Sequence, residues 1–152
     1  MTPEEKLKSL DIELQEMPKP LGSYLPFVRT GNLLYLSGML PLRDGKLIKE
    51  GRVGENVTPD DAVQLARAAA INALAVLRYA VGSLNNVKRC VKITGFISSA
   101  QDFTGQPKVL NGASDLIFDI FDEAGRHARA AVGVNVLPMN SPIEIEFIFE
   151  VE

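Results

Sequence analysis

The chain has 152 residues, of which 46% are hydrophobic and 23% charged, a composition that fits one globular domain and excludes a disordered protein. Its formal net charge of −3 provides no basic surface for phosphate backbones, so a nucleic-acid-binding protein is not expected. The single cysteine, the polar N-terminus and the lack of an apolar run of about 20 residues predict a cytoplasmic protein without a signal peptide or a membrane span.

The N-terminal part of the chain is predicted to contain one short helix followed by two strands. A polar helix is expected over residues 3–10, and the prolines of Met17-Pro18-Lys19-Pro20 require an extended connection after it. Residues 24–29 and 33–39 are predicted as strands on either side of the turn signal Thr30-Gly31-Asn32.

The clearest helix of the sequence follows a loop over residues 42–57, in which Asp44-Gly45 forms a turn. Thr58 is placed to cap this helix, Pro59 fits its first position, and Gly82 ends it in a left-handed conformation. Apolar residues recur at helical spacing between these ends. They are Ala62, Leu65, Ala66, Ala69, Ala73, Val76, Leu77 and Ala80. With so many alanines on its buried face, the helix is expected to lie close against a sheet.

The second half of the chain is predicted to add a strand, a helix and two final strands. Residues 87–98 alternate as a strand, and a helix over residues 108–124 follows and ends at Gly125. One face of that strand is formed by Val87, Val91, Ile93 and Ile97. The final strands lie within residues 128–137 and 143–151. The order β-β-α-β-α-β-β predicts an α+β domain with a mixed sheet and two helices on one of its faces.

The last strand predicts that the chain forms oligomers. One side of it is entirely apolar, and the other side carries glutamates together with Ile148. The apolar side is Ile143, Ile145, Phe147, Phe149 and Val151. Burial within one domain accounts for only one of these sides, so the second sheet face is expected to pack against other subunits.

Arg129 is the first candidate for a ligand-binding side chain. In the strand that contains it, the residues on its own side are Ala131 and Gly133, which have almost no side chain. Such a pattern leaves a hole beside a cation, where backbone N–H groups and the planar guanidinium fork can bind a carboxylate together. The alternative from the pattern alone is an ion pair between Arg129 and a strand glutamate.

Glu144 is the second candidate, because it begins the final strand directly after the turn Met139-Asn140-Ser141-Pro142. A glutamate in such a place can act as a general base that activates water. The alternative is a solvated surface carboxylate on an amphipathic strand.

Several segments of the chain together resemble the Rid/YjgF family, also labelled the endoribonuclease L-PSP family. The spacing from the arginine to the Leu-Pro pair and to the first glutamate agrees with the C-terminal signature of that family. The resemblance covers residues 20–151 in the right order and leaves residues 1–19 as an N-terminal extension. The segments are Gly22-Ser23-Tyr24, Leu36-Ser37-Gly38-Met39-Leu40-Pro41, Asn111, Ala128-Arg129-Ala130-Ala131-Val132-Gly133-Val134, Leu137-Pro138 and Ile143-Glu144-Ile145-Glu146.

The resemblance implies a chorismate-mutase-like fold in residues 20–152, a homotrimer with clefts between subunits, and no cofactor or metal. It also implies hydrolysis of small 2-imino or 2-enamino acids to 2-keto acids and ammonia. By position, Arg129 would hold the substrate carboxylate and Glu144 would activate water. The pocket would be lined by Tyr24, Ser37, Gly38 and Asn111. Ala131 replaces the cysteine or serine that is common in the family, so only its backbone N–H remains to bind substrate.

The separation of the two candidates along the chain predicts a shared site between chains. Arg129 lies eight residues before Leu137, which is about 26 Å of strand, whereas Glu144 directly follows the turn. Within one chain the two are therefore expected toward opposite ends of the sheet. A joint role then requires different chains or a strong bend.

Two further residues invite a catalytic interpretation that the sequence does not support. His127 is the only histidine, and neither a metal site nor a Ser-His-Asp triad can be built around it. It is predicted at a strand edge, with a place in the pocket wall as the alternative. Cys90 is predicted as a small core residue.

Two functions other than deamination remain open from the sequence. One is a trimeric module that binds a small carboxylate metabolite without converting it. The other is an endoribonuclease, which the acidic charge of the chain makes a weaker hypothesis.

Overall fold

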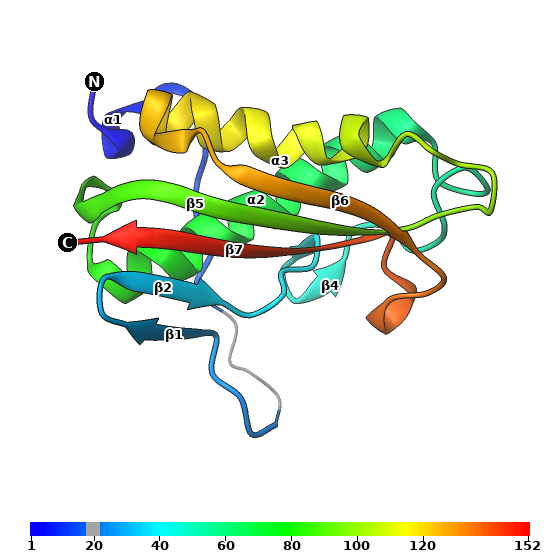
Figure 1. The fold of residues 1–152 in the computed structure, drawn as a ribbon, viewed down its shortest axis with the longest axis horizontal. Helices are drawn as coiled ribbons and strands as arrows, with labels where there is room; N and C mark the ends of the chain where they lie inside the picture. Colours follow the sequence, from blue (N-terminus) through cyan, green and yellow to red (C-terminus); the bar gives the residue numbers. More distant parts are fainter. Residues whose placement is uncertain (18–21) are drawn as a thin grey trace.

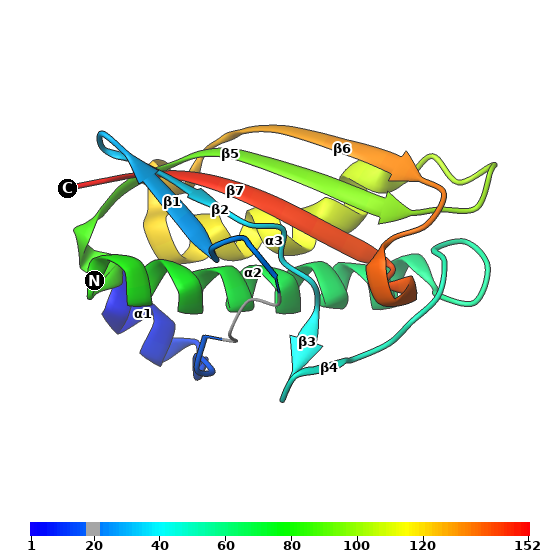
Figure 2. The same ribbon diagram turned by 90° about the horizontal axis from the view of Figure 1, so that it is seen from below.

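The computed structural model describes residues 1–17 and 22–152 and shows a twisted five-stranded sheet with helices on one face (Figure 1). Figure 2 shows the two long helices side by side on the same side of the sheet. The predicted α+β class with a mixed sheet and helices on one face is confirmed. Of the predicted extended connection, residues 18–20 lie outside the described residues.

The sheet has the strand order β1-β2-β7-β5-β6. Neighbouring strands are antiparallel except for β5 and β6, which are parallel. A parallel pair needs a crossover connection, and α3 provides it. The strands are β1 (Phe27–Thr30), β2 (Leu33–Leu36), β5 (Val87–Ser98), β6 (Ala128–Val134) and β7 (Ile143–Val151).

The helical layer contains three α-helices and short 3₁₀ turns within the described residues. These are α1 (Pro3–Ser9), α2 (Pro59–Val81), α3 (Gln106–Phe121), η1 (Leu84–Asn86), η2 (Asp122–Gly125) and η3 (Pro138–Asn140). The predicted ends of α2 are confirmed, since Thr58 Oγ1 accepts a hydrogen bond from the Asp61 N–H at 3.1 Å and Gly82 has a φ of 83°. Over the residues that the structure covers, no helix has the length and apolarity to span a membrane.

The core lies between the helices and the apolar side of β7, whose five inward residues are all buried. The predicted alanine face of α2 is fully buried as well, from Ala62 to Ala73. The two long helices also approach closely, because Gly112 of α3 lies directly against the Val63 carbonyl group of α2. Small residues therefore set the short distances within the helical layer.

The structure corrects several predicted boundaries. The strand predicted over residues 33–39 ends at Leu36, and only an isolated bridge between Met39 and Ile145 continues it. The predicted loop over residues 42–57 contains a small hairpin of β3 (Leu42–Arg43) and β4 (Lys46–Leu47). The second long helix begins two residues earlier than predicted, because Pro107 fits its first turn.

The predicted inward face of β5 is wrong at one position. The register with β7 shifts between Cys90 and Lys92, as it does where an extra residue forms a bulge. As a result Cys90 is buried, as predicted for a core residue, whereas Val91 is only partly buried. A bulge depends on the partner strand, so the alternation within residues 87–98 does not show it.

The sheet face turned away from α2 and α3 is called the open face. In a single chain it carries several exposed apolar side chains, including Val28 at 54%, Tyr35 at 42% and Val132 at 43% exposure. The strand register places these residues on the same side as Ile148 and Glu144 of β7. Within residues 1–17 and 22–152, helices of the same chain thus cover only one face of the sheet.

Candidate active site

Arg129 lies on β6, one of the two edge strands of the sheet, and its side chain turns toward α3. Its Nη1 donates hydrogen bonds to Asn111 Oδ1 at 2.8 Å and to Ser114 Oγ at 3.1 Å, and its Nη2 donates to the Pro107 carbonyl at 3.3 Å. In the described part of the chain, no carboxylate lies within ion-pair distance of this guanidinium. The alternative that Arg129 pairs with a strand glutamate is therefore wrong.

Ser114 connects Arg129 to His127, the residue just before β6. His127 Nε2 lies 2.9 Å from Ser114 Oγ, and its Nδ1 lies 2.7 Å from the Gly125 carbonyl oxygen. The pKa of His127 is lowered, mainly because burial disfavours the charged ring and further because of the positive charge on Arg129. His127 directly precedes the edge strand β6, in agreement with its predicted place at a strand edge, and the lowered pKa favours the neutral ring.

The space beside Arg129 is partly filled. Ala131 packs against the hydrophobic core, and a Cβ atom on Gly133 would lie 2.9 Å from the side-chain nitrogen of Gln106. Gln106 in turn donates to the Phe103 carbonyl at 2.8 Å. The predicted hole next to the cation is therefore narrower than the sequence suggests, and its floor near Gly133 is polar.

The outer edge of β6 presents backbone donors. The Val134 carbonyl accepts from the Ser99 N–H at 3.2 Å, so Val134 directs its backbone groups toward β5. Backbone direction alternates along a strand, which turns the N–H groups of Arg129, Ala131 and Gly133 toward the open edge. The backbone N–H groups of Ala131 and Arg129 thus face the same open edge of β6.

Glu144 lies on the open face near the start of β7. A Cβ atom on Gly38 would collide with Oε1 of Glu144 and would lie 3.0 Å from its Cδ, so the carboxylate rests on the bare backbone of Gly38. Partial burial raises the pKa of Glu144, and the nearby Glu146 charge raises it further. The side chain of Glu144 is half-buried, so it is more enclosed than the solvated surface carboxylate of the alternative interpretation.

Within one chain, the side chains of Arg129 and Glu144 lie on opposite faces of the sheet. Arg129 pairs with Ile93, which is level with Phe147, and Phe147 is three residues beyond Glu144 on β7. That offset is about 10 Å along the strands, so the expectation of opposite ends of the sheet is wrong. Instead the side chains point to opposite faces, one toward α3 and the other onto the open face.

The remaining predicted residues divide between the two candidates. Asn111 contacts Arg129 directly, whereas Gly38 contacts Glu144. The Ser37 hydroxyl donates to the Leu25 carbonyl, and Leu25 directly follows Tyr24, which is 55% exposed. We call the first group the arginine half-site and the second the glutamate half-site. The arginine half-site comprises Arg129, Asn111, Ala131 and Ser114. The glutamate half-site comprises Glu144, Gly38, Ser37 and Tyr24.

Sequence reasoning missed Ser114 and the Pro107 carbonyl as partners of Arg129. The signal for Ser114 was present, because it follows Asn111 by three positions on a helix and therefore lies on the same side. No sequence signal identifies a particular backbone carbonyl.

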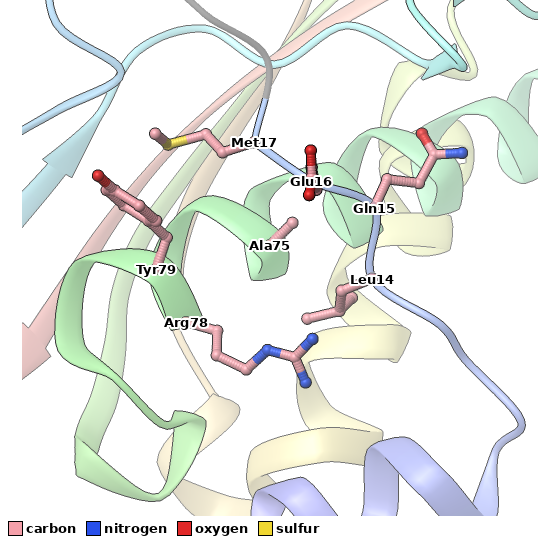
Figure 3. A pocket seen from close by; sticks show the side chains of 7 residues that line it. All are labelled: Leu14, Gln15, Glu16, Met17, Ala75, Arg78 and Tyr79. Atoms are coloured by element: carbon pink, nitrogen blue, oxygen red, sulfur yellow. The ribbon is translucent and has the colours of Figure 1, made fainter.

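A cavity of about 550 Å³ lies between residues 14–17 and α2 (Figure 3). None of the predicted site residues lines it. Its lining is Leu14, Gln15, Glu16, Met17, Ala75, Arg78 and Tyr79. This cavity is thus separate from the residues that carry the candidate chemistry.

Comparison with known proteins identifies the family. A family model described as YjgF/chorismate_mutase-like, with an endoribonuclease label, matches residues 4–151. The chain belongs to this family. Protein TCP17 of Trypanosoma cruzi is 39% identical over 145 residues, which are 95% of this chain and 91% of that protein. A crystal structure from Shewanella oneidensis, also labelled an endoribonuclease, has 36% identity and a TM-score of 0.96 over 99% of this chain and 100% of that one.

Two more distant members of the YjgF-like family carry informative names. A protein of Dermatophagoides farinae named 2-iminobutanoate/2-iminopropanoate deaminase is 31% identical over 135 residues, 89% of this chain and 91% of that protein. The crystal structure of Escherichia coli TdcF with bound serine has 25% identity and a TM-score of 0.67, covering 92% of this chain and 97% of that one. Family membership and the predicted fold are thus confirmed.

Proposed function

We propose that this YjgF-like protein hydrolyses small 2-imino and 2-enamino acids to 2-keto acids and ammonia, in clefts between the subunits of a homotrimer. The observation that carries the proposal is the guanidinium of Arg129, which has only neutral partners in the described chain. A fixed cation without a carboxylate partner suits an anionic ligand. The deaminase name of one relative and the serine bound to TdcF support a small amino-acid-like ligand.

The proposed reaction needs one base and no cofactor. Glu144 accepts a proton from water as the water oxygen bonds to the carbon of the protonated imine, which gives a neutral carbinolamine. The protonated carboxyl then returns the proton to nitrogen and the C–N bond breaks. The hydroxyl proton passes through Glu144 to the departing ammonia as the C=O bond forms. A raised pKa suits a carboxyl group that must both take up and release a proton. An enamino acid enters the same path after its tautomerisation to the imine.

The proposed assembly follows from the separation of the half-sites. Because Arg129 and Glu144 point to opposite sides of one sheet, a shared cleft needs the arginine half-site of one copy and the glutamate half-site of another. When two different surfaces of identical subunits bind each other, the subunits form a closed ring if the rotation from one subunit to the next adds up to a full turn. A ring of three subunits has three equivalent clefts. The exposed apolar side chains of the open face would be covered in that contact.

The proposal is tested by assaying keto-acid and ammonia release from iminopropanoate generated freshly in the assay. We expect turnover by the wild type and a loss of at least about 100-fold in kcat/KM for Arg129→Ala and Glu144→Gln. Arg126→Ala is a matched control, since Arg126 is exposed and pairs with Glu123 at 2.9 Å. Unchanged activity of Arg129→Ala would contradict the assigned mechanism.

Two measurements separate the proposal from its alternatives. Light scattering is expected to give three times the 16.6 kDa mass of one chain, and a monomer would rule out the shared cleft. Thermal stabilisation by pyruvate that requires Arg129 but not Glu144, without turnover, would instead indicate a carboxylate-binding module.

A further inference from the structure

The only histidine of the chain ends a hydrogen-bonded series that begins at Arg129. Arg129 Nη1 lies 3.1 Å from Ser114 Oγ, Ser114 Oγ lies 2.9 Å from His127 Nε2, and His127 Nδ1 lies 2.7 Å from the Gly125 carbonyl. The proposed chemistry uses neither Ser114 nor His127. Both side chains are nevertheless partly buried, where an unpaired polar group would cost stability. Ser114 belongs to α3, and His127 lies against it.

The direction of every hydrogen bond in this series is determined by its two ends. A carbonyl oxygen can only accept, so His127 Nδ1 carries the proton and donates to Gly125. In a neutral ring Nε2 must then accept, and the only donor in this contact is the Ser114 hydroxyl. The hydroxyl proton is thereby committed to His127, which leaves the lone pairs of Ser114 Oγ directed to Arg129.

The lowered pKa of His127 agrees with this assignment, since burial and the Arg129 charge both favour the neutral ring. A serine next to an arginine could otherwise rotate its hydroxyl toward other acceptors. With His127 in place, Ser114 acts toward Arg129 only as an acceptor.

A count of donors shows what the series does for Arg129. The guanidinium has five N–H donors. Asn111 and Ser114 accept both hydrogens of Nη1, and Pro107 accepts one hydrogen of Nη2. Within the described residues, this leaves Nε–H and the second Nη2–H as the donors available for a ligand carboxylate.

We propose that Ser114 and His127 are positioning residues that orient the Arg129 guanidinium for the substrate carboxylate. This inference rests on the proposed function of Arg129. His127 does not touch substrate; it fixes the hydroxyl of Ser114, and Ser114 together with Asn111 fixes Nη1. The two free donors are then held in one orientation beside α3.

A first experiment tests the hydrogen-bond direction without any activity. Because His127 is the only histidine, ¹⁵N-labelled protein without a histidine tag gives the nitrogen signals of a single imidazole ring. We expect the neutral tautomer with the proton on Nδ1, and a shift of the Nε2 signal in Ser114→Ala. A ring protonated on Nε2, or an Nε2 signal unaffected by Ser114→Ala, would overturn the inference whatever the enzyme does.

A second experiment uses two pairs of matched variants. Gln places an acceptor near the position of Nε2, whereas Asn places a donor near the position of Nδ1, so His127→Gln should retain the bond to Ser114 and His127→Asn should lose it. Likewise Ser114→Thr keeps the hydroxyl and Ser114→Ala removes it. We expect KM for the imino acid to rise roughly three- to tenfold in His127→Asn and Ser114→Ala, with a smaller change in kcat, and to stay near wild type in the other two.

The outcomes distinguish the inference from the proposed function. Equal KM values within each pair, in a wild type that is active and depends on Arg129, would overturn the positioning role alone. If the wild type has no turnover, the same variants are compared by their dissociation constants for pyruvate. Absence of both turnover and Arg129-dependent pyruvate binding would remove the proposed function, and the positioning role with it.

Discussion

Replacement of Gly38 by alanine is expected to displace the Glu144 carboxylate while leaving the fold intact. Gly38 is not among the residues with positive φ, so its backbone accepts alanine without strain. The new Cβ atom would collide with Oε1 and lie 3.0 Å from Cδ and 3.1 Å from Cγ of Glu144. Since carbon atoms in contact prefer about 3.5–4.0 Å, the carboxylate has to retreat by about 0.5–1 Å.

The size of this displacement sets the expected effects. The obstructing atoms belong to the end of a flexible side chain, so the free energy of unfolding should change by less than about 1 kcal/mol. A misplacement of about 1 Å at a reacting group can reduce the rate about 100-fold. We therefore expect kcat/KM for iminopropanoate to fall about 10- to 100-fold, while thermal unfolding stays close to that of the wild type.

A double-mutant cycle isolates the contact between the two residues. Glu144→Asp draws the carboxylate back by one methylene, which makes room for the Cβ atom of alanine at position 38. Gly38→Ala should therefore cost much less activity in the Glu144→Asp background than in the wild type. An equal loss in both backgrounds would refute the argument that Gly38→Ala acts by displacing the carboxylate.

Three further predictions concern packing and protonation. Gly112→Ala should destabilise the protein by about 1–2 kcal/mol in chemical denaturation, since overpacking against the Val63 backbone outweighs the gain in helix propensity; a stabilised variant would contradict this. Burial raises the pKa of the Cys90 thiol to about 12, so a thiol reagent near pH 8 should label it only after unfolding, and rapid labelling of native protein would disagree. The pKa of Glu144 is raised, so its contribution to stability is fully present below its ordinary pKa and is lost as pH rises through the folded value. The melting temperature of Glu144→Gln relative to wild type should accordingly increase between about pH 4 and pH 7, and a constant difference would exclude the shift.

The elements that the sequence predicts best are those with local signals. The ends of α2 depend on Thr58, Pro59 and Gly82, whose effects act within a few residues of each end, and the structure has them as predicted. The bulge near Cys90 depends on the register between β5 and β7, which are distant in the sequence. It therefore could not be derived from alternation within β5.

In the candidate site, too, the features with local sequence signals could be predicted, and those that depend on contacts between distant segments could not. The inward and outward sides of β7, including the placement of Glu144 opposite the core, follow from strand alternation and are confirmed. The hydrogen bonds of Arg129 depend instead on how the crossover places α3 beneath β6. Only this tertiary arrangement shows that Asn111 contacts the arginine, whereas Gly38 contacts the glutamate.

The opposite orientation of Arg129 and Glu144 has a genetic consequence for the proposed ring. An Arg129→Ala subunit keeps its glutamate half-site, and a Glu144→Gln subunit keeps its arginine half-site. In a ring that contains both kinds of subunit, one cleft combines the intact arginine half-site of a Glu144→Gln subunit with the intact glutamate half-site of an Arg129→Ala subunit. Two alleles that are each inactive alone would then complement one another when they are expressed in the same cell.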